Sequence, residues 1–304
     1  MHSLRYQRLS EMVFNEPQYA TAAVMDSVKA ALMPQLNLTV VNAPIEQELS
    51  KEVQAPRKGD GQQVGVIPVH GVLATRGMAL DEACNPILSY EVLRNQIQAA
   101  LDDPEINTIV LDIYSGGGMA VGCYELAEFI YENRDTKPII AIVNYYAYSA
   151  AYFIAAACSE IYVPTTGGVG SIGVRLEHVE FSKMAENQGI TFTTFVRGAR
   201  KADLSDTAPL SQEAIQSVDR KMDANYELFV SSVAKYRNLS VDAVKDTQAD
   251  CFTGKEALEL GLADHLMNPQ EAINKVASTI PQSSKKYQLQ AQAMAMKTRL
   301  HLEA

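Results

Sequence analysis

Ser149 lies where an apolar strand would meet a helix, and a serine hydroxyl at such a junction can act as a nucleophile. Residues 138–143 are almost wholly apolar, and residues 150–158 have the length and alanine-rich composition of a packed helix. The serine would lie beside unpaired backbone N–H groups and the positive end of the helix dipole. Because serine is also a favoured N-cap, capping is the competing interpretation. Acyl transfer further requires a base and donors for an oxyanion.

Three successive glycines are candidates for the oxyanion donors. The sequence Tyr-Ser-Gly-Gly-Gly at residues 114–118 directly follows a predicted strand at 108–113, and a predicted helix at 121–131 begins just beyond it. Glycines in a row let backbone N–H groups face a bound carbonyl with no side chain in the way. The phosphate-loop patterns G-x-G-x-x-G and G-x-x-x-x-G-K-[ST] are both absent. A simple tight turn is the alternative.

The base could be a histidine or a lysine. None of the five histidines has the setting of a triad histidine, although none is excluded. A lysine can act as the base when burial lowers its pKa. Lys201 differs from the other lysines, because it follows a predicted strand at 191–196 and a turn at 197–200, where a chain can pass close to an active site. Surface lysines are nevertheless the default.

The elements that would position these residues indicate an α/β fold. Short apolar strands alternate with helices of about ten residues, as in βαβ units with a parallel sheet covered on both faces. The predicted strands are 64–69, 108–113, 139–143 and 161–163, and the helices between them are 90–101, 121–131 and 150–158. Further helices are predicted at 19–32, 176–188 and 211–237. We expect an N-terminal arm and linker over residues 1–60, a main domain over 61–268 and a helical tail over 269–304.

Composition limits the classes of function. The 304 residues carry a net charge of −10, which argues against nucleic acid as the main partner. No run approaches the ~20 apolar residues of a spanning helix, and the start of the chain lacks the apolar core of a secretory signal, so no membrane partner is expected. The four cysteines form no C-x-x-C pair and the histidines no ligand spacing. We therefore expect neither a metal nor another cofactor.

Five motifs follow one another along the chain: Tyr-Ser-Gly-Gly-Gly at 114–118, Ala-Tyr-Ser at 147–149, Gly-Ser-Ile-Gly-Val at 170–174, Gly-Ala-Arg-Lys at 198–201 and Gly-Lys-Glu-Ala-Leu-Glu-Leu-Gly-Leu-Ala-Asp at 254–264. In this order they resemble the S49 peptidases, which include the signal peptide peptidase A enzymes and the lambda-type prohead proteases of tailed phages. The resemblance runs from about residue 64 to residue 264. The family's fold is similar to that of the caseinolytic protease and crotonase group, in agreement with the βαβ pattern.

The resemblance implies roles for particular residues. Ser149 would be the nucleophile and Lys201 the general base of a Ser-Lys dyad. The N–H groups of Gly117 and Ala150 would form the oxyanion hole, with Gly116 or Gly118 in its place if the turn is shifted. The family commonly has Ser-Gly-Gly where this chain has Ser-Ala-Ala at 149–151, and Ser-Pro-Gly-Gly where it has Ser-Gly-Gly-Gly at 115–118. Alanine keeps the N–H donors, so this difference affects the shape of the subsites more than activity.

Within the family, the phage branch fits better, because Phe-Asn-Glu-Pro at residues 14–17 resembles the start of prohead proteases. This implies a homo-oligomeric endopeptidase that cleaves scaffold, portal or coat protein inside the assembling prohead, in the host cytoplasm. A bacterial cytoplasmic protease like signal peptide peptidase A is an alternative. So are a non-catalytic assembly subunit with the same fold and a crotonase-like thioester enzyme, although the last lacks an evident pair of catalytic acids.

Overall fold

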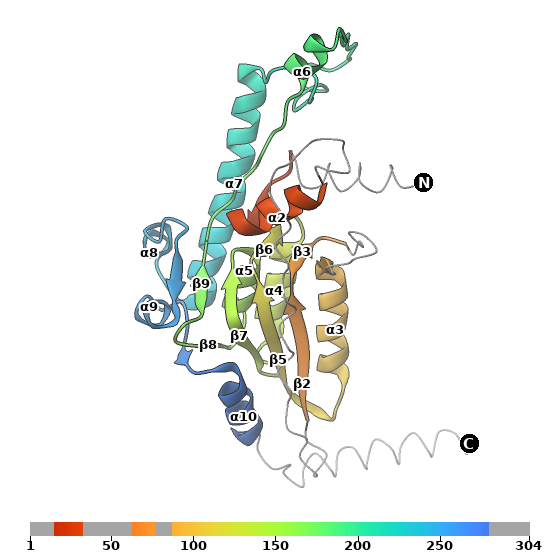
Figure 1. The fold of residues 1–304 in the computed structure, drawn as a ribbon. Helices are drawn as coiled ribbons and strands as arrows, with labels where there is room; N and C mark the ends of the chain where they lie inside the picture. The colour runs from red at the N-terminus through yellow and green to blue at the C-terminus, as the bar shows by residue number, and fades with distance from the viewer. Residues whose placement is uncertain (1–14, 33–62, 77–86, 280–304) are drawn as a thin grey trace, which may run out of the picture.

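The computed structural model describes residues 15–32, 63–76 and 87–279. Its main sheet has seven strands in the order β10-β9-β7-β5-β2, with β8 pairing with β7 and β11 with β8 (Figure 1). Strands β2, β5, β7 and β8 are parallel neighbours. The strands are β2 (Gln63–His70), β5 (Ile106–Ser115), β7 (Ile139–Tyr148), β8 (Glu160–Val163), β9 (Gly168–Gly170), β10 (Cys251–Thr253) and β11 (His265–Leu266).

Helices cover both faces of this sheet. The crossover helices α3 (Tyr90–Asp102), α4 (Cys123–Asn133) and α5 (Ala150–Ala156) share one apolar core with alternate residues of the strands. On the other face, α10 (Pro269–Thr279) packs Ile273 and Val276 against Val110 and Ile142. Because both faces are buried at the centre of the sheet, the central strands β5, β7 and β8 are mostly apolar. The α/β class and the βαβ units expected from the sequence are confirmed.

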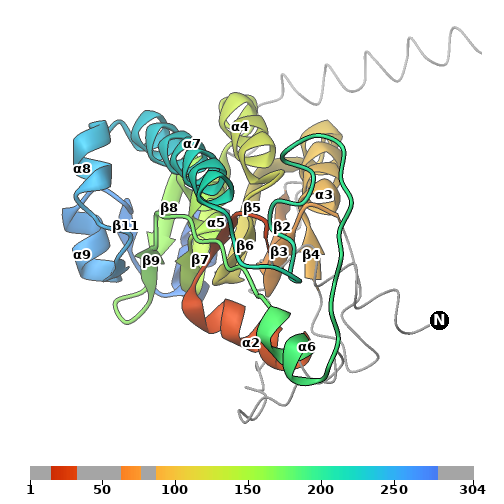
Figure 2. The same ribbon diagram turned by 90° about the horizontal axis from the view of Figure 1, so that it is seen from above.

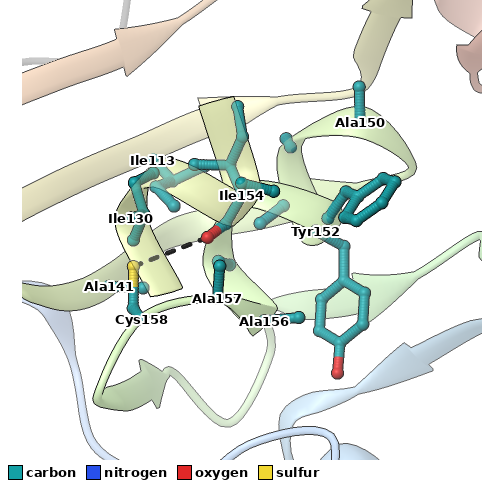
Figure 3. Packing of buried hydrophobic residues seen from close by; sticks show 14 of the residues in the cluster. Ile113, Ile130, Ala141, Ala150, Tyr152, Ile154, Ala156, Ala157 and Cys158 are labelled. Atoms are coloured by element: carbon teal, nitrogen blue, oxygen red, sulfur yellow. Dashed lines mark hydrogen bonds between the residues drawn. The ribbon is translucent and has the colours of Figure 1, made fainter. Parts of the chain in front are cut away.

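Helix α5 lies at the centre of the larger core. All seven of its residues are buried, and its small alanines let it pack closely against strand residues such as Ile113 and Ala141 (Figure 3). Just beyond the helix, the Cys158 thiol donates a hydrogen bond to the carbonyl of Ile154, 3.5 Å away. Close packing of this kind fixes the direction in which the start of α5 points.

A second sheet, of order β1-β6-β3-β4, lies beside the first. Its strands are β1 (Gln18–Ala20), β6 (Gly117–Met119), β3 (Val72–Ala74) and β4 (Ile87–Ser89). Helix α2 (Ala22–Leu32) buries Val24, Met25 and Val28 there. The sequence predicts a helix from residue 19, whereas the structure places Tyr19 in β1 because that segment pairs with β6.

We call the two sheets and the helices packed on them the body. Residues 176–211 extend away from the body, and the chain returns to it along α7 (Gln212–Arg237) (Figures 1 and 2). We call residues 176–211 the projection. Two expectations fail here. The helix expected over 176–188 is reduced to α6 (Ser182–Asn187), and residues 191–196 form no strand. Residues 191–195 are all exposed, so their β-branched and aromatic side chains lack the half-buried surface that favours a strand.

The chain after α7 returns to the body through α8 (Val241–Lys245) and α9 (Gly254–Glu259). Arg237, at the end of α7, pairs with Asp264 through two hydrogen bonds of 2.7 and 2.9 Å. The predicted linker before residue 63 and the tail beyond residue 279 lie outside the described residues. The domain boundaries expected at residues 60 and 268 therefore stay predictions.

Candidate active site

Ser149 occupies a sharp turn from β7 into α5. Its backbone has φ 57° and ψ −119°, a conformation that residues other than glycine rarely adopt. Two hydrogen bonds hold the turn: the Ser149 N–H donates to the Gly170 carbonyl at 2.8 Å, and the Phe153 N–H donates to the Ser149 carbonyl at 2.9 Å. Strand–turn–helix geometry of this type exposes a nucleophile at the end of a sheet.

Capping does not explain this serine. Ser149 stands at the N-cap position of α5, yet its side chain accepts no capping hydrogen bond. Among the described residues, no side chain bonds to its hydroxyl, and only 1% of the residue is exposed. By contrast, the N-cap Ser211 accepts a hydrogen bond from the Ala214 N–H at 3.1 Å. The Ser149 hydroxyl is therefore positioned without performing the usual task of a helix-capping serine.

The glycine turn lies directly beside Ser149. Strands β5 and β7 are parallel neighbours, and Ser115 is aligned with Ala147, so the segments after both strands meet at one edge of the sheet. A methyl group added to Gly117 would lie 3.1 Å from Ser149 Cβ and 3.0 Å from the Ala150 nitrogen. Gly117 also has φ +100°, which side-chain-bearing residues rarely adopt. The structure therefore brings together three of the predicted site residues, Gly117, Ser149 and Ala150.

The predicted oxyanion donors differ in their present partners. The Ala150 N–H precedes the first hydrogen-bonded turn of α5 and has no partner within the helix. The Gly117 N–H donates to Ser115 Oγ at 3.1 Å, and the Ser115 hydroxyl donates to the Gly71 carbonyl at 2.6 Å. Ser115 thus anchors the glycine turn, and the Gly117 N–H would have to leave it to reach an oxyanion.

The alternative glycines face other parts of the chain. A methyl group on Gly116 would lie 2.5 Å from Val24 Cγ2, and its carbonyl accepts a hydrogen bond from the Thr21 N–H at 3.0 Å. A methyl group on Gly118 would lie 1.8 Å from the Leu73 carbonyl oxygen. Gly116 therefore lies under the N-terminal segment, and Gly118 lies against β3.

Lys201 is not brought to Ser149 within one chain. It lies in an exposed turn of the projection, where its N–H donates to the Gly198 carbonyl at 3.1 Å. Its side chain makes no hydrogen bond or ion pair with any described residue, Ser149 included. The adjacent Arg200 is instead paired with Asp203 at 2.8 Å. The dyad expected from the sequence stays a prediction.

Two histidines of the described chain and the cysteine beside α5 are occupied elsewhere. His70 lies 3.1 Å from buried Asp112, and His178 lies 2.8 Å from Asn15. Cys123 lies beside α5 and donates to the Ala150 carbonyl at 3.6 Å, and burial raises the pKa of its thiol. A thiol with a raised pKa stays protonated and is a poor nucleophile. Of the described residues, Ser149 is thus the better-placed nucleophile.

Two contributors to the site were not predicted from sequence. Gly170 orients Ser149 through its carbonyl, and Tyr19 places its own carbonyl oxygen 2.1 Å from the position of a methyl group on Gly117. Gly170 belongs to a motif quoted above, but its role follows only from the pairing of β9 with β7. No local pattern connects Tyr19 with a glycine turn about a hundred residues away.

Neither a metal site nor a spanning helix is found in the described part of the chain. No group of three or more histidine, cysteine or acidic side chains there could hold a metal ion. Nor is any helix within residues 15–32, 63–76 and 87–279 long and apolar enough to cross a membrane.

Comparison with known proteins identifies the family to which the chain is related. Residues 131–281 match the model of peptidase family S49. The capsid assembly protease C of Escherichia phage lambda is 33% identical over 281 residues, 87% of this chain and 64% of that protein. The head-tail preconnector protein GP5 of Enterobacteria phage P21 is 36% identical over 219 residues, 71% of this chain and 43% of that protein. The chain thus spans less than two thirds of the length of either relative.

Among solved structures, a ClpP1 mutant from Listeria monocytogenes aligns with 68% of this chain and 94% of its own, at 11% identity and a TM-score of 0.42. The family match and the two phage relatives lead to one conclusion: this chain belongs to peptidase family S49.

Proposed function

We propose that the protein is a serine endopeptidase that cleaves polypeptides through an acyl-enzyme. The main observation in support of this proposal is that Ser149, the Ala150 N–H and Gly117 lie together at the start of α5. In the first step Ser149 Oγ bonds to the substrate carbonyl carbon as its proton passes to the base. The base then protonates the leaving amine as the C–N bond breaks, and water releases the acyl group.

The oxyanion would be held by the N–H groups of Ala150 and Gly117. The Ala150 N–H is available at the first turn of the helix, and the Gly117 N–H would exchange the Ser115 hydroxyl for the oxyanion. Gly116 remains the alternative donor if the turn shifts. Each preorganised donor contributes about 3 kcal/mol to stabilisation of the transition state.

We infer that the base is Lys201 of a neighbouring copy. In a single chain Lys201 is exposed and makes no contact with Ser149, so a homo-oligomer is needed to complete the dyad. The projection that bears Lys201 also exposes large apolar side chains, namely Met184, Ile190, Phe192 and Phe195. Docking onto a second copy would bury these apolar side chains together with Lys201. Burial lowers the pKa of a lysine and so favours the neutral amine that a general base requires.

The expected substrates are scaffold, portal or coat proteins of an assembling phage prohead, within the host cytoplasm. This proposal rests on the two phage relatives, one of which is named a capsid assembly protease. No nucleic acid or membrane partner and no cofactor enter it. A bacterial cytoplasmic protease like signal peptide peptidase A is the alternative for the same catalytic site.

The test uses Ser149→Ala and Lys201→Ala, alone and mixed, with an unfolded polypeptide and a candidate scaffold protein as substrates. Each variant alone should lose at least about 10³-fold in cleavage rate, since each lacks one half of the dyad. A mixture of the two should recover part of the activity, because mixed oligomers contain some sites with both residues. Cleavage is followed by gel electrophoresis and mass spectrometry.

Lys183→Ala is the matched control, because Lys183 is another lysine of the projection, on α6. It should cleave like the parent protein. Full cleavage by Ser149→Ala would refute the assignment of the nucleophile. Inactive mixtures from otherwise assembled variants would place the dyad within one chain. Failure of a fluorophosphonate probe to label Ser149 in the assembled parent would favour a non-catalytic assembly subunit.

A further inference from the structure

Strand β6, which contains the glycine turn, has its second edge covered by the protein's own N-terminal segment. One edge pairs with β3 through Leu73 and Gly118, and the other pairs antiparallel with β1. Hydrogen bonds from the Ala120 N–H to the Pro17 carbonyl (3.2 Å) and from the Thr21 N–H to the Gly116 carbonyl (3.0 Å) extend this pairing beyond β1. The edge that could receive an added polypeptide strand is therefore filled.

The opposite side of β1 is bound in the same way. Gln18 forms an antiparallel bridge with Arg175: its N–H donates to the Arg175 carbonyl at 2.8 Å, and the Arg175 N–H donates to the Gln18 carbonyl at 3.0 Å. The segment thus lies extended in a groove with two backbone walls, one at β6 and one at residue 175. Backbone pairing of this kind binds an extended peptide largely independently of its sequence.

This groove reaches the candidate nucleophile. The position of a methyl group on Gly117 is 2.1 Å from the Tyr19 carbonyl oxygen, 3.0 Å from the Ala150 nitrogen and 3.1 Å from Ser149 Cβ. A peptide carbonyl of β1 thus lies on the side of Gly117 that Ala150 and Ser149 also approach. With this segment in place, Ser149 is almost completely buried.

Tyr19 anchors the segment through a side-chain pocket between α5 and α7. Its ring centroid lies 4.7 Å from that of Phe229 and 5.8 Å from that of Phe153, and its hydroxyl donates to the Asn225 carbonyl at 2.7 Å. Only 1% of Tyr19 is exposed. The pocket therefore accommodates an aromatic side chain whose polar end can donate a hydrogen bond.

The ion pairs that flank β1 are weak enough to exchange, whereas α2, just beyond β1, is held by the burial of Val24, Met25 and Val28. Glu16 pairs with Lys221 at 2.8 Å and Lys29 with Glu177 at 2.6 Å, both near the surface. The Asn15 N–H donates to the Glu177 carbonyl at 3.0 Å. Exposed ion pairs contribute roughly 0–1 kcal/mol each, so they guide the segment into the groove without locking it there.

We propose that the segment around β1 is a built-in pseudosubstrate, which fills the strand-binding groove beside Ser149 and must leave before a substrate can enter. This inference rests on the proposed peptidase function, and it specifies the substrate as an extended polypeptide with an aromatic side chain for the Tyr19 pocket. Because the segment is tethered, it competes at a high effective concentration, and its departure raises the apparent affinity for substrate.

A reversible disulfide tests the proposal without requiring catalysis. Gln18→Cys and Arg175→Cys are combined in full-length protein carrying Ser149→Ala; directly paired antiparallel residues are close enough for a disulfide. The probe is a fluorescein-labelled peptide with the sequence of residues 15–21, and binding is measured by fluorescence anisotropy. The oxidised protein should bind it at least tenfold more weakly than the reduced protein, and dithiothreitol should restore binding. The control is Gln18→Cys alone, oxidised in the same way.

Removing the anchor provides a second, independent test. Tyr19→Ala, again with Ser149→Ala, should bind the peptide at least tenfold more tightly than Ser149→Ala alone, whereas Tyr19→Phe should stay close to it because the ring is kept. A second peptide carrying Tyr19→Ala should bind more weakly than the first to every form with an accessible groove. If Tyr19→Ala does not fold, the disulfide comparison decides the matter.

The outcomes separate this inference from the proposed function. Equal peptide binding by the oxidised and reduced proteins, or no binding by any form, would show that β1 is a permanent structural strand. If binding responds to the disulfide, but parent protein with Ser149 neither cleaves an unfolded polypeptide nor becomes acylated, the peptidase proposal fails and only the displacement of β1 from the groove stands.

Discussion

The body around α5 and the projection contribute to the candidate site in opposite ways. Every residue of α5 is buried, and Gly117, Ser149 and Ala150 are held together by packing within one chain. In the projection, by contrast, Ala185 alone is buried among residues 176–211. Lys201 is exposed on this segment, and Phe195 on the same segment is 87% exposed.

This difference indicates how the site would be controlled. Ser149 and the Ala150 N–H, the proposed nucleophile and oxyanion donor, are held in place by folding, so this part of the candidate site exists in any folded copy. The proposed base, Lys201, would become available only when the projection meets a second copy. A peptidase built in this way would stay inactive until copies assemble, and the segment around β1 would add a second restraint on the same site.

The strongest test of this comparison places a methyl group on one glycine in each region. Gly118→Ala puts the new methyl 1.8 Å from the Leu73 carbonyl oxygen, where backbone would have to move. We expect a loss of at least about 4 kcal/mol in the free energy of unfolding, or failure to fold. In the projection, Gly189→Ala meets nothing within 4 Å, and only its φ of +72° opposes the change. It should lose about 1 kcal/mol.

Urea unfolding followed by circular dichroism measures both changes. Similar losses for the two variants would mean that the projection is as tightly constrained as the body. A small loss for Gly118→Ala would mean that β3 and β6 can separate, which would weaken the claim of a preorganised glycine turn.

A second comparison removes one phenyl ring from each region. Phe229 is fully buried and stacks on Phe153 with ring centroids 4.4 Å apart, so Phe229→Ala should lower stability by about 3–5 kcal/mol. Phe195→Ala should change the stability of the single chain by no more than about 0.5 kcal/mol. Because Phe195 is expected at a contact between copies, its loss should weaken the oligomer.

Unfolding curves and sedimentation velocity at several protein concentrations distinguish these effects. An unchanged oligomer in Phe195→Ala would remove that side chain from the assembly interface. A marked loss of single-chain stability in the same variant would contradict the exposed position of residue 195.

The sequence predicted the body better than the projection for a physical reason. Strands such as 108–113 and 139–143 are apolar because both faces of the sheet are covered, so their pattern reports their surroundings directly. Adjacent parallel strands end at one edge, so the glycine turn and Ser149 could be expected to meet. Residues 191–196 have strand-like composition, but strands need partners, and no described neighbour pairs with them.

The missed features depend on contacts between segments far apart in the chain. Tyr19 belongs by composition to a helix, yet pairing with Gly118 places it in a strand. Likewise, the long helix α7 carries apolar side chains at both ends, but only the Phe229 end is buried against the body; Ile215 is 39% exposed. Periodicity reports which face is apolar and not how much of it finds a partner.

The smallest expected effect concerns the junction where α7 meets α4. Burial raises the pKa of the Glu128 carboxyl, but hydrogen bonds from Lys235 and Tyr236 outweigh burial and hold the pKa below its ordinary value of 4.5. A carboxyl with a lower pKa in the folded state stabilises the fold above its unfolded pKa. That contribution is lost as pH falls through the folded value.

We therefore expect Glu128→Gln to lower the free energy of unfolding by about 1 kcal/mol at pH 7, with the difference from the parent disappearing as the pH falls below 4.5 and through the lowered pKa of the Glu128 carboxyl. Urea unfolding at a series of pH values measures this. Glu227→Gln is the matched control, because Glu227 pairs with Lys245 at 2.6 Å but is 54% exposed, and it should show a smaller difference at every pH. If both variants behave alike, the base of α7 is no better anchored to the body than an exposed ion pair.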